Sequence, residues 1–132
     1  VRPPLVVSHA PRRGRVLVVD DEPLVATVVS RVLAAEHDVV ALNRAKDALD
    51  RVLKGEHFDV ILCDLMMPEF SGMDFYQELR AQRPEQLDDL VFITGGAFSP
   101  SARAFLDDVA NARLEKPFDP DHLRTLINDR VR

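Results

Sequence analysis

Acidic side chains follow two of the most hydrophobic runs of this sequence. The segment VLVVDDEP (residues 16–23) leads from four apolar residues into Asp20 and Asp21, and the segment VILCD (residues 60–64) ends in Asp64. Three carboxylates brought close together cannot all ionise comfortably at neutral pH without a cation. The only cysteine is Cys63, and no histidine follows a strand directly, so the available ligands are hard oxygens. Such oxygens suit Mg²⁺, and the pattern predicts a carboxylate-bound Mg²⁺.

Two further side chains could contact the same ligand. The hydroxyl of Thr94, which precedes Gly95, can donate to an anionic oxygen, and the ammonium of Lys116 is a point charge suited to another. A carboxylate nucleophile, Mg²⁺, a lysine and a hydroxyl donor are the parts needed to move a phosphoryl group onto aspartate. That transfer depends mainly on positioning and charge neutralisation.

Two hydrophobic periods alternate along the chain from Arg15 onward. Short runs rich in β-branched residues predict strands at residues 15–20, 38–42, 58–64, 90–94 and 112–115. Apolar residues at helical spacing predict helices near residues 25–33, 45–53, 72–83, 102–109 and 123–131. Alternating strands and helices predict an α/β fold, in which helices cover both faces of a parallel sheet.

The candidate residues lie where the predicted strands end. Asp20 and Asp21 follow the first strand, Asp64 ends the third, Thr94 ends the fourth, and Lys116 follows the fifth. Ligands of open parallel sheets bind outside the carboxyl ends of the strands. We therefore expect these five side chains to share one edge of the sheet.

Each candidate also has a plainer structural interpretation. Asp21 or Glu22 before Pro23 fits the N-terminus of a helix, with one of the two acids as its cap. Asp64 alone would be a solvated loop residue, and Lys116 alone a surface lysine. Because five such residues are unlikely to meet at one edge by chance, the set favours a functional site. The four histidines show no ligand spacing and are expected at the surface or at its boundary.

The sequence resembles the receiver domains of the two-component response-regulator family. The matching segments occur in the family's order and are VLVVDDEP (16–23), VILCDLMMPEFSGMDF (60–75), FITGGA (92–97) and EKPF (115–118). The resemblance covers residues 15–132. It implies a flavodoxin-like (βα)5 doubly wound parallel sheet of five strands in the order 2-1-3-4-5. It also implies phosphorelay signalling, in which the partner is a histidine kinase or a histidine phosphotransfer domain.

The resemblance assigns the acceptor and the metal ligands by position. Asp64 matches the phosphoacceptor, which takes a phosphoryl group from a phosphohistidine. Asp21 matches the direct Mg²⁺ ligand, and Asp20 the acid that helps to hold the metal, often through water. Met66 matches the position whose backbone carbonyl ligates Mg²⁺.

The resemblance also assigns the residues that respond to phosphorylation. Thr94 matches the hydroxyl that moves toward the phosphoryl group, and Lys116 matches the lysine that contacts one of its oxygens. The peptide bond between Lys116 and Pro117 is expected to be cis. Receivers usually carry Tyr or Phe three residues before this lysine, and here that residue is Arg113. The departure leaves three routes for signalling: Arg113 itself, Phe98, or small shifts of the fourth helix.

Length and composition limit the setting of this site. A chain of 132 residues suits one domain, and a net charge of -5 argues mildly against a nucleic-acid-binding surface. A single cysteine gives no disulfide framework, so a cytoplasmic location is expected, and no apolar run is long enough to span a membrane. Residues 1–14, rich in proline and arginine, are expected to be a linker or tail before a receiver domain at 15–132. This lead-in and the start on valine favour a receiver from a hybrid histidine kinase over a free-standing regulator.

Three rival functions are weighed against this interpretation. A dinucleotide-binding enzyme would need G-x-G-x-x-G where this chain has DDEPLV (residues 20–25). A phosphatase of the haloacid dehalogenase type would need aspartate two residues after its nucleophile, but Glu22 follows Asp20 at that spacing. A receiver-shaped interaction module that is never phosphorylated would typically have lost the acids or the lysine. We therefore expect a phosphoacceptor domain that is not an enzyme, although the parent chain of a hybrid would be a protein-histidine kinase.

Overall fold

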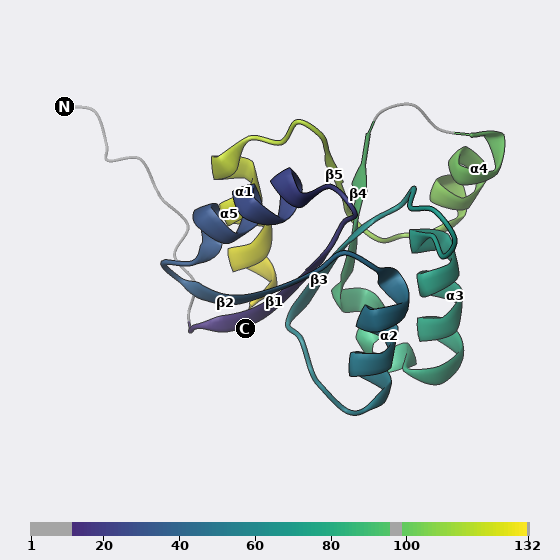
Figure 1. Cartoon of the computed structure of the whole chain (residues 1–132), viewed down its shortest axis with the longest axis horizontal. Coiled ribbons are helices and arrows are strands. Elements are labelled where there is room, and N and C mark those ends of the chain that lie inside the picture. Colours follow the sequence, from purple (N-terminus) through teal and green to yellow (C-terminus); the bar gives the residue numbers. More distant parts are fainter. Residues whose placement is uncertain (1–11, 96–98, 132) are drawn as a thin grey trace.

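The computed structural model describes residues 12–95 and 99–131. Five parallel strands form one sheet in the order β2-β1-β3-β4-β5, which confirms the predicted topology (Figure 1). The strands are β1 (Gly14–Val19), β2 (His37–Leu42), β3 (Val60–Asp64), β4 (Leu90–Thr94) and β5 (Arg113–Glu115).

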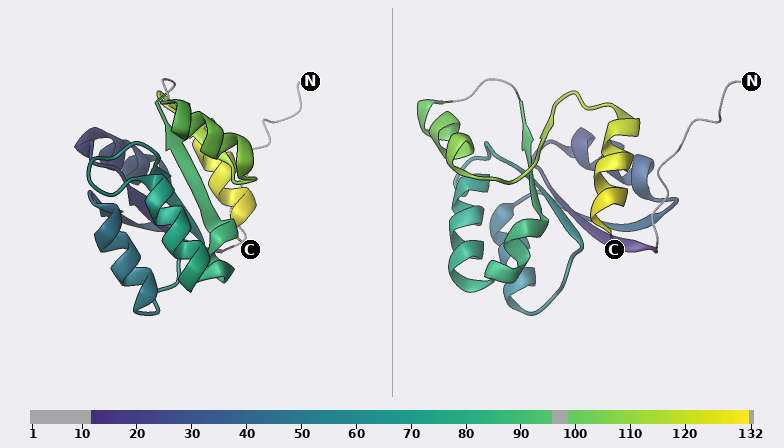
Figure 2. Two further views of the ribbon diagram at one scale, coloured as in Figure 1. Left: turned by 90° about the vertical axis from the view of Figure 1, so that its right-hand side faces the viewer. Right: turned by 180° about the vertical axis from the view of Figure 1, so that it is seen from behind.

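Helices cover both faces of this sheet, as the alternation predicts. They are α1 (Pro23–Leu33), α2 (Ala45–Leu53), α3 (Gly72–Gln82), α4 (Pro100–Asp108) and α5 (Pro120–Arg130). Helices α1 and α5 pack on one face, while α2, α3 and α4 pack on the other (Figures 1 and 2). None of the helices in the described ranges is long and apolar enough to cross a lipid bilayer.

Each face of the sheet has its own hydrophobic core because successive side chains of a strand point to opposite sides. In β1, Leu17 and Val19 pack with α2, α3 and α4, whereas Val16 and Val18 pack with α1 and α5. The central strands β3 and β4 are buried along their whole length. This double burial explains why the strands are apolar without alternation.

The helix beginnings differ in a way that bears on the site. Side chains of Ser71, Ser99 and Asp119 cap α3, α4 and α5 by accepting backbone hydrogen bonds. Helix α1 instead begins with Pro23 after Glu22, and the Glu22 side chain makes no capping hydrogen bond. Glu22 therefore occupies the N-cap position of α1, as expected, but its carboxylate does not cap the helix.

One element was not expected from the sequence. A 3-10 helix, η1 (Pro84–Asp89), links α3 to β4. Six residues are too few to show a period, so the segment PEQLDD gives no helical pattern. Its buried Gln86 exchanges two hydrogen bonds of 3.3 Å with the backbone of Phe58, and this fixes the turn before β3.

His37 also departs from expectation, because it is buried rather than superficial. Its Nδ1 accepts a 3.0 Å hydrogen bond from the Gly14 backbone, and its Nε2 lies 2.6 Å from Asn128 Oδ1. Both ring nitrogens thus have hydrogen-bond partners, so burial of the imidazole leaves no polar atom of the ring unsatisfied. The contact joins the start of the sheet to α5.

The structure begins to describe the chain inside the predicted lead-in. Gly14 is the first residue of β1, one residue before the predicted domain start, and Arg13 pairs with Asp38 at 2.8 Å. Residues 1–11 lie outside the described residues, so the division into a lead-in (1–14) and a receiver domain (15–132) stays a prediction.

Candidate functional site

The three acids predicted to bind a metal meet at the carboxyl edge of the sheet. Asp64 ends β3, and Asp20 and Asp21 follow β1, which pairs with β3 through Val19 and Cys63. One carboxylate oxygen from each acid lies within 4.8 Å of the others. Asp20 and Asp64 are buried, whereas Asp21 is exposed. Their predicted convergence is confirmed, and their roles as metal ligands stay predictions.

A close backbone approach fixes the orientation of Asp64. Its Oδ1 accepts a 3.2 Å hydrogen bond from the backbone N–H of Met66. The first turn of α3 packs against this segment at Gly72, where an added Cβ would lie 2.6 Å from the Asp64 carbonyl oxygen. Only glycine fits such an approach. The glycine of the segment SGMDF (71–75) therefore sets the distance between α3 and the acceptor strand.

Lys116 lies among acids from several elements. Its backbone N–H donates to the Thr94 carbonyl at 2.8 Å, which extends the pairing of β4 with β5. Its Nζ lies 2.9 Å from Asp20 Oδ2, 3.1 Å from Glu22 Oε1 and 3.7 Å from Asp64 Oδ2. The peptide bond to Pro117 is cis, as expected. The lysine thus lies close to two of the three predicted acids, Asp20 and Asp64, and to one further acid, Glu22.

Glu22 is the site residue that sequence reasoning missed. The third acid of the DDEP segment was interpreted only as part of a helix N-terminus. Its carboxylate instead pairs with Lys116, and its backbone N–H donates to Asp20 Oδ1 at 2.9 Å. The available signal was a long acidic side chain placed directly after two acids of the site.

Thr94 is buried at the same edge with an unusual hydroxyl. Among the described residues, its Oγ1 has no hydrogen-bond partner. A buried polar atom without a partner costs about 1–3 kcal/mol, so a native protein that keeps one needs a reason for it. An oxygen ligand bound at this edge would supply the partner. Phe98 and Gly96, which follow Thr94, lie outside the described residues.

The electrostatics of the site favour a cation there. Burial and the charge of Asp20 raise the pKa of Asp64 to about 6, and the Met66 N–H and Lys116 offset only part of that rise. Burial alone would lower the pKa of Lys116, but the Asp20 and Glu22 carboxylates outweigh it and raise the pKa. The acids therefore hold the lysine firmly charged, and one ammonium does not fully compensate them.

The donor set fits Mg²⁺. Carboxylates of Asp20, Asp21 and Asp64 supply hard oxygens, and backbone carbonyls such as that of Met66 are of the same kind. Cys63 faces the core rather than the site, and burial together with the nearby Asp64 and Asp20 charges raises its pKa, so it supplies no thiolate.

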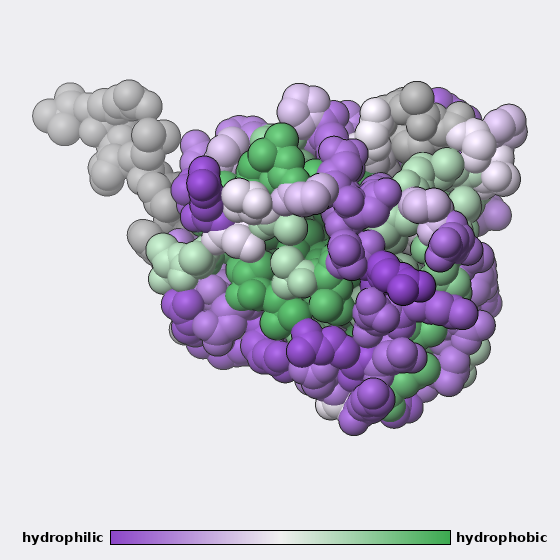
Figure 3. All heavy atoms as spheres, viewed as in Figure 1, coloured by the Kyte–Doolittle hydropathy of each residue, from purple (hydrophilic) through white to green (hydrophobic). Residues whose placement is uncertain are grey.

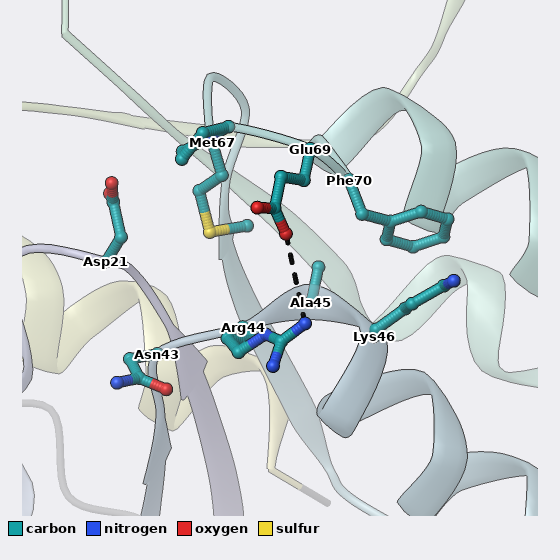
Figure 4. A pocket seen from close by; sticks show the side chains of 9 residues that line it. Asp21, Asn43, Arg44, Ala45, Lys46, Met67, Glu69 and Phe70 are labelled. Carbon is teal, nitrogen blue, oxygen red and sulfur yellow. Dashed lines mark ion pairs between the residues drawn. The ribbon is translucent and has the colours of Figure 1, made fainter.

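A pocket of about 450 Å³ opens beside Asp21 (Figure 4). The turn after β2 supplies Arg44 to one wall, and the loop before α3 supplies Glu69 to the other. The Arg44 guanidinium and the Glu69 carboxylate lie 3.9 Å apart across the pocket. Glu69 has a left-handed backbone with φ of 67°, which marks a tight turn in this loop. The pocket leaves the Asp21 side of the site open to solvent.

A second, apolar groove is lined in part by Lys116 and Glu22. It measures about 410 Å³ and is lined mainly by α1 and by the segment after β5. Leu24 at its rim is 70% exposed. On the face drawn in Figure 3, hydrophobic residues gather around α1 and β2, and hydrophilic residues surround them. The site edge is therefore flanked by one polar and one apolar hollow.

Comparison with known proteins gives a consistent result. Residues 16–128 match the response regulator receiver domain family. The hydrogenase transcriptional regulatory protein HoxA of Bradyrhizobium diazoefficiens is 32% identical over 90% of this chain, which spans 24% of the length of that relative. A chemotaxis protein CheY homolog of Campylobacter jejuni is 25% identical, with 87% of this chain and 90% of that protein covered.

Solved structures agree with these sequence relatives. The chemotaxis protein CheY4 of Vibrio cholerae is 30% identical and superposes with a TM-score of 0.73. The superposition covers 91% of this chain and 99% of that one. The fold of this chain is thus shared with solved structures of chemotaxis proteins of this kind.

Proposed function

The chain belongs to the response regulator receiver domain family, and from this premise we propose that Asp64 accepts a phosphoryl group in an Mg²⁺-dependent reaction. The donor is a phosphohistidine of a histidine kinase or of a histidine phosphotransfer domain. The observation that carries the proposal is the meeting of the buried Asp64 with two further acids, Lys116 and Thr94 at one sheet edge. A receiver-like module that is never phosphorylated would not need that arrangement.

Mg²⁺ would be held by the carboxylates of Asp20, Asp21 and Asp64 and by the backbone carbonyl of Met66. When bound, it would neutralise charge on these carboxylates and on the phosphoryl oxygens. The raised pKa of Asp64 supports this assignment, because burial and the neighbouring Asp20 charge disfavour its ionised form and a bound cation would favour it.

The side chains divide the transfer step among them. A carboxylate oxygen of Asp64 attacks phosphorus, an O–P bond forms, and the P–N bond to the donor imidazole breaks. The electron pair of that bond returns to the imidazole nitrogen. Lys116 pairs with one phosphoryl oxygen, and the Thr94 hydroxyl donates to another. Thr94 Oγ1 has no hydrogen-bond partner in the described part of the chain, and Lys116 Nζ lies 3.7 Å from Asp64 Oδ2; both observations support these roles.

Output and cellular setting follow from the same premise. Phosphorylation would alter contacts with partner proteins, as in a cytoplasmic phosphorelay, and the domain would act as a regulatory module without an enzymatic activity of its own. Its source in a hybrid histidine kinase stays a prediction. The transcriptional regulator HoxA is far longer than this chain, so its output does not transfer with the receiver.

Site mapping tests the proposal directly. The protein is incubated with acetyl phosphate and Mg²⁺, reduced with borohydride to trap an acyl phosphate, and digested for peptide mass mapping. We expect one modified residue, Asp64, and none in Asp64→Asn. An Asp50→Asn variant, which changes an exposed acid of α2, serves as the matched control and should be modified like the wild type. Modification at another residue would contradict the proposal.

A further inference from the structure

Glu22 bridges the ends of two strands that are not neighbours in the sheet. Its backbone N–H holds Asp20 Oδ1 at 2.9 Å, and its carboxylate holds Lys116 Nζ at 3.1 Å. The carboxylate of Glu22 makes no capping hydrogen bond to helix α1, which starts at the next residue. The side chain is therefore committed to the lysine rather than to its own helix.

The two carboxylates on either side of Lys116 differ in their exposure. The Asp20 side chain is 0% exposed and the Glu22 side chain is 62% exposed, while that of Lys116 is 18% exposed. An exposed ion pair is weak and is readily exchanged, whereas a buried one is costly to break. Asp20 is thus the fixed anchor of the lysine, and Glu22 is the partner that can be given up.

The distances give this exchange a direction. Lys116 Nζ lies 3.1 Å from Glu22 but 3.7 Å from Asp64, which is beyond hydrogen-bond reach. A phosphoryl group on Asp64 would bring its own oxygens toward this ammonium, and those oxygens would compete with the Glu22 carboxylate for it. The Glu22 pair therefore exists in the unphosphorylated protein and is lost when Lys116 serves a phosphoryl oxygen.

We propose that Glu22 is a positioning residue that holds Lys116 at the rim of the site and competes with the phosphoryl group for its ammonium. The inference rests on the proposed function, because it concerns the lysine that would meet the phosphoryl oxygen. An interaction present in the free protein and absent from the transition state raises the barrier to transfer. Glu22 therefore acts as a brake on phosphorylation.

The test compares the rate of phosphorylation of Glu22→Gln with that of the wild type, with acetyl phosphate and Mg²⁺ at low ionic strength. Loss of an exposed pair of this kind predicts a rate increase of roughly two- to fivefold. Added salt screens the pair, so the two rates should converge as ionic strength rises. An unchanged or slower rate of Glu22→Gln overturns the proposal.

Glu115→Gln is the matched control. It removes the same charge one residue before Lys116, at an exposed position that makes no ion pair among the described residues. If Glu22 acted only by repelling the anionic donor, Glu115→Gln would accelerate the reaction to a similar degree. The proposal predicts a rate close to that of the wild type.

A second readout does not depend on phosphorylation. Urea unfolding of Glu22→Gln, Lys116→Met and the double variant, without Mg²⁺, gives the coupling between the two side chains. We expect a favourable coupling for this pair and none for Glu115 with Lys116; absence of coupling overturns the proposal. Should the wild type accept no phosphoryl group, the proposed function fails and the brake with it. A phosphorylated wild type with an unaccelerated Glu22→Gln defeats only the inference.

Discussion

The ammonium of Lys116, just after β5, lies 2.9 Å from the fully buried carboxylate of Asp20, just after β1. Strands β3 and β4 separate these two strands in the sheet, so the ion pair spans the edge on which the acceptor lies. The same ammonium lies 3.7 Å from Asp64 Oδ2, which is beyond hydrogen-bond distance. The ammonium is therefore close to the acceptor carboxylate without being hydrogen-bonded to it.

Stability without Mg²⁺ should depend on the protonation of Asp64. Its pKa of about 6 lies above the usual value, so the folded protein binds this proton more tightly than the unfolded chain does. The resulting stability is fully present below about pH 4 and is lost as the pH rises through about 6. Asp64→Asn removes this loss, and its free energy of unfolding at neutral pH should exceed that of the wild type by about 1–3 kcal/mol.

Urea unfolding of both proteins between acidic and neutral pH, with a chelator present, measures this difference. Asp50→Asn is the control, and it should follow the wild type across the range. A wild type more stable than Asp64→Asn at neutral pH would contradict this prediction. It would show that the negative charge of Asp64 is already balanced by positive charge in the metal-free protein.

Mg²⁺ should stabilise the protein, and that effect should require Asp21. A ligand that binds only the folded state raises stability by RT ln(1 + [L]/Kd), which is about 2.7 kcal/mol at a hundredfold excess over Kd. Thermal unfolding with and without Mg²⁺ is compared for wild type, Asp21→Asn and Asp50→Asn. We expect a higher Tm with Mg²⁺ for the wild type and for the Asp50 variant only. An equal rise in the Asp21 variant would place the metal elsewhere.

Gly72 should tolerate no side chain, because an added Cβ would meet the Asp64 backbone at 2.6 Å. Forcing a group into a packed site costs about 1–3 kcal/mol, and Gly72→Ala should lose that much stability. The strain falls on the acceptor segment, so phosphorylation should slow as well. Gly95→Ala is the control, since a Cβ there meets no described atom within 4 Å. Similar losses in both variants, measured by urea unfolding, would contradict the close approach of α3.

Arg113 should hold the end of α4. Its guanidinium donates to the Leu106 carbonyl in the last turn of that helix. This last turn contains no basic residue and carries two acids, Asp107 and Asp108. A cation at a helix C-terminus contributes about 0.3–1 kcal/mol, and Arg113→Ala should lose a similar amount of stability. Hydrogen exchange should show faster opening of α4 but not of α3. Arg113→Lys, which keeps the charge, should recover part of the protection, and uniform exchange changes would argue against a local role.

Sequence patterns predicted most of this fold because they report on burial along one element at a time. Apolar runs without alternation marked β1 and β3, and the acids that follow or end these two runs marked the site edge. The patterns could not predict contacts set by tertiary packing. Glu22 was interpreted from the sequence only as part of a helix N-terminus, because its pairing with Lys116 depends on how β1 and β5 are placed in the sheet. Likewise, the sequence shows that Arg113 stands where receivers usually carry Tyr or Phe. It does not show that the Arg113 guanidinium donates to the Leu106 carbonyl of α4.

The buried His37 illustrates the same limit. A histidine in a short strand at the edge of the sheet is expected at the surface. His37 is buried because its ring is hydrogen-bonded to Asn128, which is 91 residues away in the chain. The 3-10 helix between α3 and β4 was missed for a different reason, since it is too short to show a period. His37 and η1 both lie away from the site edge. At the site edge, the residue types were informative by themselves for the three aspartates, Thr94 and Lys116.

The intact mass of the protein after incubation with acetyl phosphate, with and without Mg²⁺, tests the central claim most directly. We predict a single phosphoryl adduct that requires Mg²⁺, is present in Asp50→Asn and is absent from Asp64→Asn. A protein that gains no adduct with Mg²⁺ present, or gains one equally well as Asp64→Asn, would contradict the assignment of Asp64 as the phosphoacceptor.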